Sequence, residues 1–339
     1  MRVLVTGGTG FVGGHTVAAL RRAGHDVRLL ARTRDRAESV LRLHGLDPSE
    51  VEVALGDMTD AGPVREAVAG CDAVVHAAAV YSLDPRDGDT MVRTGPEGAR
   101  IVLGSALEAG ATRAVHVSSV AAMLSRRPGT RLTPSSPVGD LRSPYYVSKQ
   151  LADQVVRGMQ ATGAAVTRFH PAGVVGPLDP HRNETNESLR GLLAARVSAW
   201  TREPFGYCDV RDCAAVLVAL AEGRGDDRPA WMPPVAMVDA SRVLAEVTGR
   251  QLRVVRSPAR VAYAALRSAD AVVRRLPRSV PAFPVAGLES FATGNIVDDE
   301  RSWEALGVVR TDVLTSFRDT VRWLVERGDL TARQAGTAV

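Results

Sequence analysis

The chain has 339 residues, 45% of them hydrophobic, and carries a formal net charge of +4 at pH 7. This length allows one large buried core or two unequal ones. No stretch approaches the roughly 18 to 20 consecutive apolar residues that a membrane-spanning helix requires, which argues against a membrane protein. Acidic and basic residues are interleaved over most of the chain, whereas nucleic-acid binding usually needs a concentrated basic face.

The cysteines and histidines indicate the compartment and argue against a metal site. Cys71, Cys208 and Cys213 are odd in number, and neither they nor the seven scattered histidines show metal-ligand spacing. We therefore expect a soluble enzyme in a reducing cytoplasm, with no bound metal. The apolar strand pattern that begins at residue 2 leaves no room for a signal peptide.

The first glycines of the chain stand between a strand and a helix. Residues 2–6 predict a short buried strand, and helical periodicity follows over 12–23. Between them Gly7, Gly10 and Gly13 form a G-x-x-G-x-x-G spacing, a variant of the dinucleotide-binding fingerprint. Such glycines allow a tight turn and a close approach of backbone to a pyrophosphate at a helix N-terminus. The sequence predicts a dinucleotide site here; the alternative is a tight turn alone.

Strand and helix patterns alternate through the first half, which predicts an α/β fold with a doubly wound parallel sheet. Strands are expected near 2–6, 27–31, 51–54, 73–76, 113–118 and 164–169, and helices in the gaps, notably near 12–23, 62–69, 96–109 and 145–162. Later helices are expected near 210–222, 239–248 and 312–327. The pattern becomes irregular after residue 171, which indicates a smaller C-terminal lobe. We expect a dinucleotide-binding domain over 1–170, a substrate lobe over 171–328 with segments returning to the sheet, and a flexible tail over 329–339.

The residues after the second strand bear on the choice between NAD and NADP. An acidic side chain there would bind the 2′-hydroxyl of NAD, whereas an arginine accommodates the 2′-phosphate of NADP. Arg32 follows the strand directly, with Arg34 and Arg36 behind it, and Asp35 is expected to point into the next helix. This favours NADP, with NAD as the alternative if Arg32 is only a solvated loop charge.

A tyrosine and the single lysine of the chain are four residues apart. Among the 42 Lys and Arg residues, Lys149 alone is a lysine, and it follows Tyr145. Positions i and i+4 share one face of a helix, so both side chains can point into one site. A nearby ammonium favours the phenolate and lowers the pKa of a tyrosine, which makes Tyr145 a candidate proton donor or acceptor.

Several motifs, in order and at matching separations, make the chain resemble the short-chain dehydrogenase/reductase family in its extended branch. They cover nearly the whole chain: Thr6–Gly13, Gly56-Asp57, 74–79, Val117-Ser118-Ser119, Tyr145-x-x-x-Lys149, 171–177 and 209–214. Within that branch the chain looks similar to the dihydroflavonol-reductase-like and 3β-hydroxysteroid-dehydrogenase-like members. The resemblance implies a Rossmann sheet with a C-terminal substrate-binding lobe, and a homodimer.

The resemblance also implies roles for individual residues. The family motif makes Ser119 the working serine, and Ser118, which faces the other side of the strand, would be structural. Asp57 would hold the adenine amino group, and His76 and Ala77 would line the pyrophosphate and nicotinamide side. The implied cofactor contacts are Gly7, Thr9, Gly10, Phe11, Val12, Gly13, Arg32, Asp57, Met58, His76, Ala77, Ala78, Tyr145, Lys149, Pro171, Gly173 and Val174.

These observations predict an NADP-dependent oxidoreductase that interconverts a ketone or aldehyde and an alcohol. Tyr145 would move the proton, Ser119 would polarise the carbonyl, and Lys149 would grip the nicotinamide ribose. One alternative is a nucleotide-sugar epimerase or dehydratase with tightly bound NAD. Another is a non-catalytic NADP sensor, against which the intact Ser–Tyr–Lys set argues. One departure from the family is Gly95, which stands at the position that matches an asparagine supporting an active-site water in relatives. Either the proton relay differs here or the match is shifted by a residue or two.

Two features of the second half concern partners. The substrate is expected to be a largely apolar small molecule, because the lobe is rich in large apolar residues, which would equally suit its core: Trp200, Phe205, Tyr207, Trp231, Met232 and Met237. Residues 250–278 hold eight arginines and one acid, and 258–276 read as a basic amphipathic helix. We favour a surface helix packed on the lobe over one that contacts a membrane surface or an anionic substrate.

Overall fold

Seven parallel strands form the central sheet, in the order β11-β7-β5-β4-β1-β2-β3. The computed structural model describes residues 1–80, 85–201, 203–258, 260, 261, 263, 264 and 285–339. The strands of this sheet are β1 (Arg2–Thr6), β2 (Asp26–Ala31), β3 (Glu52–Leu55), β4 (Ala73–His76), β5 (Arg113–Val117), β7 (Val166–Phe169) and β11 (Ala230–Trp231). The order reverses between β1 and β4, so the carboxyl ends of these two strands border the crevice in which such sheets bind ligands.

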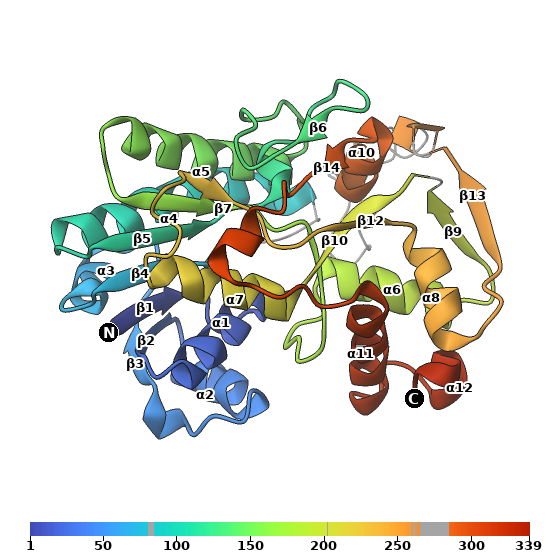
Figure 1. Ribbon diagram of the computed structural model, residues 1–339, viewed down its shortest axis with the longest axis horizontal. Coiled ribbons are helices and arrows are strands. Elements are labelled where there is room, and N and C mark those ends of the chain that lie inside the picture. Colours follow the sequence, from blue (N-terminus) through green and yellow to red (C-terminus); the bar gives the residue numbers. More distant parts are fainter. Residues whose placement is uncertain (81–84, 202, 259, 262, 265–284) are drawn as a thin grey trace.

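Helices cover both faces of the sheet (Figure 1). One face carries α1 (Phe11–Arg22), α2 (Arg34–Leu43) and α7 (Val210–Ala221), and the other carries α3 (Ala61–Val68), α4 (Gly88–Glu108) and α5 (Pro144–Ala161). Val3 and Val5 belong to the core under α1 and α7, while Leu4 packs with α3 and α4. This alternation follows from the two-residue period of a strand, and confirms the predicted α/β doubly wound fold.

The expected strands agree with the observed ones within about two residues, but α4 differs. The sequence indicated a helix near 96–109. In the structure α4 begins at Gly88 and continues through Pro96. The helix therefore reaches eight residues closer to the crevice than expected, and it tolerates an interior residue without an N–H donor.

The remaining elements form a smaller lobe beside the carboxyl edge of the sheet (Figure 1). They are β8 (Gly173–Val175), α6 (Glu184–Ala194), β9 (Ser198–Thr201), β10 (Phe205–Asp209), β12 (Ala236–Val238), α8 (Ala240–Thr248), β13 (Val254–Ser257), α10 (Val285–Thr293), α11 (Val313–Glu326) and α12 (Ala332–Ala335). A parallel pair, β6 (Arg131–Leu132) and β14 (Ile296–Val297), joins the loop before α5 to this lobe.

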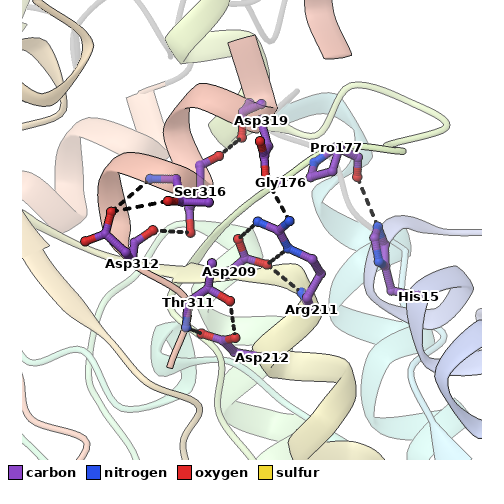
Figure 2. Close-up of polar contacts among 12 residues, drawn as sticks. His15, Gly176, Pro177, Asp209, Arg211, Asp212, Thr311, Asp312, Ser316 and Asp319 are labelled. Carbon is purple, nitrogen blue, oxygen red and sulfur yellow. Dashed lines mark hydrogen bonds and ion pairs between the residues drawn. The ribbon is translucent and has the colours of Figure 1, made fainter. Parts of the chain in front are cut away.

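Ion pairs and hydrogen bonds fasten α7 to α11 and to the segment just before it (Figure 2). The Arg211 guanidinium donates to Asp209 at 2.7 Å and to Asp319 of α11 at 2.8 Å. The buried carboxylate of Asp212 accepts from the Thr311 hydroxyl at 2.6 Å. Because α7 packs on α1 and α11 belongs to the lobe, these contacts fix the lobe against the sheet layer.

Residues 329–339 differ from the flexible tail that the sequence suggested. Thr331 and Gln334 form a capping box at the start of α12. Leu330, Ala335 and Ala338 are buried in the core cluster of the lobe. The helix has four residues, too few to show the periodic apolar pattern of a helix. In the sequence, the capping-box pair Thr331 and Gln334 could have indicated where this helix begins.

Two further expectations concern the second half. Most of the proposed basic helix 258–276 lies outside the described residues, and the part before it forms β13.

Cys208 and Cys213, whose spacing in the sequence is not that of metal ligands, lie together as free thiols with their sulfur atoms 3.6 Å apart. Within the described ranges, every helix is too short or too polar to cross a membrane.

Leu330→Ala tests the packing of the C-terminal segment. Emptying a buried leucine site should lower the free energy of unfolding by about 2–5 kcal/mol, measured by denaturant unfolding. Arg333→Ala, at an exposed position of the same segment, is the control and should leave stability unchanged. Equal stability of both variants and the parent would indicate a mobile tail.

Candidate active site

The glycine-rich turn is held against the end of β4. Gly7 has φ +73°, and a Cβ there would lie 2.5 Å from the backbone of Ala77 and Ala78. A Cβ on Gly13 would lie 2.2 Å from the carbonyl oxygen of Gly7. At Gly10 the one contact is that same oxygen at 3.3 Å, so space remains beside the N-terminus of α1. Close backbone approach therefore requires glycine at Gly7 and Gly13, in agreement with the fingerprint.

The Thr6 hydroxyl fastens this turn to β4. Its oxygen lies 2.7 Å from Nδ1 of His76 and accepts a hydrogen bond from the Ala78 amide at 3.2 Å. The His76 side chain is only 1% exposed. The ring of His76 therefore holds the Thr6 hydroxyl in place, and the contact of His76 with a cofactor stays a prediction.

Asp57 and Arg32 lie near each other where β3 and β2 end. The Asp57 carboxylate accepts from the amide and hydroxyl of Thr59 at 3.0 and 2.7 Å. These bonds, aided by the positive charge of Arg32, lower the pKa of Asp57. Arg32 is exposed. The Met58 side chain packs against Gly98 of α4, and its contact with a cofactor stays a prediction.

Ser119 and Tyr145 form the central pair of the site. Their hydroxyl groups share a hydrogen bond. The Ser119 oxygen also accepts from the Ala121 amide at 3.2 Å and lies 3.4 Å from the Pro171 carbonyl, to which it can donate. Ser118 is buried, and its hydroxyl has no partner among the described residues. The structure thus brings Ser119, and not Ser118, to Tyr145.

The pKa of Tyr145 corrects one expectation. Burial raises it to about 12, and the hydrogen bond from Ser119 offsets only part of this rise. Lys149 was expected to lower this pKa toward neutrality, but desolvation of the phenolate dominates in the buried site. Tyr145 therefore stays protonated at neutral pH and is suited to donate a proton.

Lys149 lies near two buried, uncharged histidines, His76 and His116. Burial lowers the pKa of Lys149 to about 8. Burial, together with the Lys149 charge, lowers the pKa of His76 to about 3, and the pKa of His116 is also well below its usual value. The rings of His76 and His116 stack with centroids 5.5 Å apart. Within the described residues, Lys149 has no carboxylate partner, so its ammonium remains available to a ligand.

Gly95 of α4 lies in close contact with Ser148 of α5. A Cβ on Gly95 would lie 2.4 Å from the Ser148 hydroxyl oxygen. That hydroxyl donates to the Met91 carbonyl at 2.7 Å. The Ser148 side chain thus occupies the space that a side chain at position 95 would need, so the expected asparagine would not fit here without a shift of Ser148.

The loop after β8 crosses to the glycine-rich turn. Pro171, beside Ser119, leads into β8, which contains Gly173 and Val174. Further along, His181 Nε2 lies 3.1 Å from the Thr9 carbonyl, and His15 Nε2 lies 3.0 Å from the Pro177 carbonyl (Figure 2). No sequence pattern indicated these contacts, because they join segments about 170 residues apart.

An apolar pocket adjoins the Ser119–Tyr145 pair. Tyr145 packs in the cluster that includes Val120, Ala172 and Val297, and these three also line the pocket. The other lining residues are Leu124, Pro204, Phe205, Gly206, Ser290, Phe291, Gly294 and Asn295. Among the described lining residues none carries a charge. Of the apolar residues named from sequence, Phe205 lines this pocket, whereas Trp231 and Met232 are fully buried core.

Comparison with known proteins shows the family. The model of the NAD dependent epimerase/dehydratase family matches residues 3–230. The chain therefore belongs to this family, within the extended short-chain dehydrogenases/reductases.

Individual relatives match over nearly their full length. A putative dihydroflavonol 4-reductase of Synechocystis sp. is 29% identical over 96% of this chain and 94% of that protein. Sterol demethylase protein B of Methylococcus capsulatus is 30% identical over 97% of this chain and 99% of that protein. The structure of Gre2 from Candida albicans, in complex with NADPH, has a TM-score of 0.71 at 17% identity and covers 96% of this chain and 99% of that chain. This last similarity shows a shared fold.

The single lysine allows a direct test of the site's electrostatics. In protein labelled with ¹³C-lysine, the one Cε resonance should titrate with a midpoint near pH 8, because burial favours the neutral amine. Lys149 is then a cation below that pH and loses its charge above it. The same resonance in denaturant should titrate close to the ordinary lysine value of about 10.4. An equally high midpoint in the folded protein would contradict the burial of Lys149.

Proposed function

We propose that this protein reduces a ketone or aldehyde to an alcohol with NADPH, or catalyses the reverse oxidation. The observation that carries the proposal is the Ser119–Tyr145 hydrogen bond, with Lys149 one helical turn away. The pair lies beside an apolar pocket and near the crevice at the glycine-rich turn. The names of two relatives, a reductase and a sterol demethylase component, are consistent with redox chemistry.

The residues at the crevice fit a nicotinamide dinucleotide. Gly7 and Gly13 allow the backbone to fold tightly, and the N-terminus of α1 offers free amides to a pyrophosphate. When bound, the cofactor would supply or accept the hydride. Lys149, still charged at neutral pH, would hold the ribose hydroxyls, and Asp57 would accept from the adenine amino group with its second oxygen.

The chain's own residues would manage the proton. Because its pKa is about 12, Tyr145 carries its proton at neutral pH and can donate it to the oxygen of a reduced carbonyl. Ser119 would donate a hydrogen bond that orients and polarises the same oxygen. Lys149 would stabilise the tyrosinate that remains, since an adjacent cation favours the charged form.

The pocket supports an apolar carbonyl compound over a nucleotide sugar. Its polar groups are already engaged: Ser290 bonds Tyr146, and Asn295 bonds the backbone of Ser125 at 2.7 Å. A sugar diphosphate needs cationic or multiple polar partners, and the described lining offers none. Phe205 and Phe291, with ring centroids 4.7 Å apart, form an aromatic wall suited to a flat substrate.

Arg32 supports NADP as the cofactor. It is exposed where β2 ends, beside the proposed adenosine site at Asp57. Within the described chain it has no ion-pair partner. A guanidinium that forms no salt bridge can bind a 2′-phosphate through charge-assisted hydrogen bonds.

Tyr145→Phe should lower kcat about 10²–10⁴-fold, because it removes the proton donor and leaves the ring in place. The measurement is NADPH consumption with an accepted aromatic ketone, found by screening. Tyr207→Phe, at a buried tyrosine in the core of the lobe, is the matched control and should retain activity. Full turnover of the Tyr145 variant would refute its proposed role.

Arg32→Ala should weaken NADPH binding roughly 10- to 100-fold, the cost of a charge-assisted hydrogen bond. Binding of NADH should be unaffected. Both affinities can be measured by quenching of tryptophan fluorescence. Arg42→Ala, which removes an arginine paired with Glu38 on α2, controls for a general loss of positive charge. Equal losses for NADPH and NADH would count against a 2′-phosphate contact.

A further inference from the structure

Helix α10 forms one wall of the apolar pocket and lies far along the chain from the Ser–Tyr–Lys residues. Ser290 and Phe291 of α10 line the pocket. Phe291 packs on Phe205 and on Trp200, with ring centroids 4.7 and 5.8 Å apart. In Figure 1 this helix lies beside the β6–β14 pair, above β10. A substrate in the pocket would therefore touch α10 directly.

The residue before this wall, Glu289, binds the start of α5. Its carboxylate accepts from the Arg142 amide at 3.1 Å, from the Ser143 amide at 3.2 Å, and from the Ser143 hydroxyl. Glu289 is only 5% exposed. The side chain of Ser143, the N-cap residue of α5, makes no capping bond within its own helix. Glu289 therefore engages the start of α5 from 146 residues away.

The next residue strengthens this junction. The Ser290 hydroxyl shares a hydrogen bond with Tyr146, the neighbour of Tyr145. Because α5 begins at Pro144, both tyrosines lie in its first turn, whereas Lys149 lies in the second. The first turn of a helix lacks intrahelical partners for its amides and frays unless other groups hold it.

We propose that Glu289 is a positioning residue for Tyr145. Its carboxylate links α10, which faces the substrate, to the first turn of α5. The link keeps the proton donor Tyr145 at a fixed position relative to the wall of the pocket. Without the carboxylate, the amides of Arg142 and Ser143 lose their acceptor and the first turn loosens. Tyr145 then drifts from Ser119 while Lys149 and the cofactor crevice stay in place. This inference rests on the proposed reductase function.

Glu289→Ala should lower kcat roughly 10- to 100-fold, the effect of a small displacement of a reacting group, and leave the NADPH dissociation constant unchanged. In hydrogen exchange, the amides of residues 142, 143 and 145–147 should lose protection while those of 149–153 keep it. Glu38→Ala, which removes a half-buried carboxylate paired with Arg42 on α2, should change neither readout. An unchanged kcat, or unchanged protection of 142, 143 and 145–147, would overturn the proposal.

Ser143→Ala is the milder second variant, because it removes one of the three bonds and leaves both backbone amides satisfied. It should lower kcat less than Glu289→Ala, and the double variant should lose no more than Glu289→Ala alone. If the losses of kcat in the two single variants add up in the double variant, Glu289 and Ser143 do not act together and the proposal is overturned. If Glu289→Ala does not fold, full activity of Ser143→Ala overturns the proposal. If the parent protein oxidises NADPH with none of the carbonyl compounds, the proposed function is refuted. The role of Glu289 at the start of α5 is then still decided by hydrogen exchange.

Discussion

The buried carboxylate of Asp153 fixes the rotation of α5, and the site depends on it. It accepts from His170 at 2.8 Å and from Arg157 at 2.6 Å, and Arg168 of β7 lies 3.4 Å away. Burial raises the pKa of Asp153, but these partners more than offset the effect and keep it charged. Tyr145, Lys149 and Asp153 are at i, i+4 and i+8, so they share one face of the helix. An anchor at Asp153 therefore turns the other two toward the crevice.

The charged groups of the site surround two uncharged histidines. Asp153 and His170 act on His116, and the ammonium of Lys149 acts on both His76 and His116. Burial lowers the pKa of Lys149 to about 8, and within the described residues no carboxylate pairs with its ammonium. Tyr145 keeps its proton because burial raises its pKa. Both properties suit a site that hands a proton to a carbonyl oxygen.

Local patterns in the sequence predicted most of the fold and the centre of the site. The two-residue and 3.6-residue periods located the strands and helices, and the i, i+4 spacing placed Tyr145 and Lys149 on one face. Tertiary contacts account for what was missed. Pro96 concealed the true start of α4, and Glu289 reaches α5 from a distant segment without any local signal. The raised pKa of Tyr145 depends on how deeply the folded chain buries it, which spacing alone does not reveal.

The central claim is that Tyr145 and Ser119 act on the carbonyl oxygen while a hydride is transferred to the carbonyl carbon. The most direct measurement uses NADPH deuterated at C4 of the nicotinamide, on either face, with an accepted aromatic ketone and analysis of the product by mass spectrometry and NMR. The proposed mechanism predicts deuterium at the carbinol carbon of the alcohol from one of the two labelled cofactors only. Turnover of a substrate with the label left in the cofactor, as in an epimerisation without net oxidation, would contradict it.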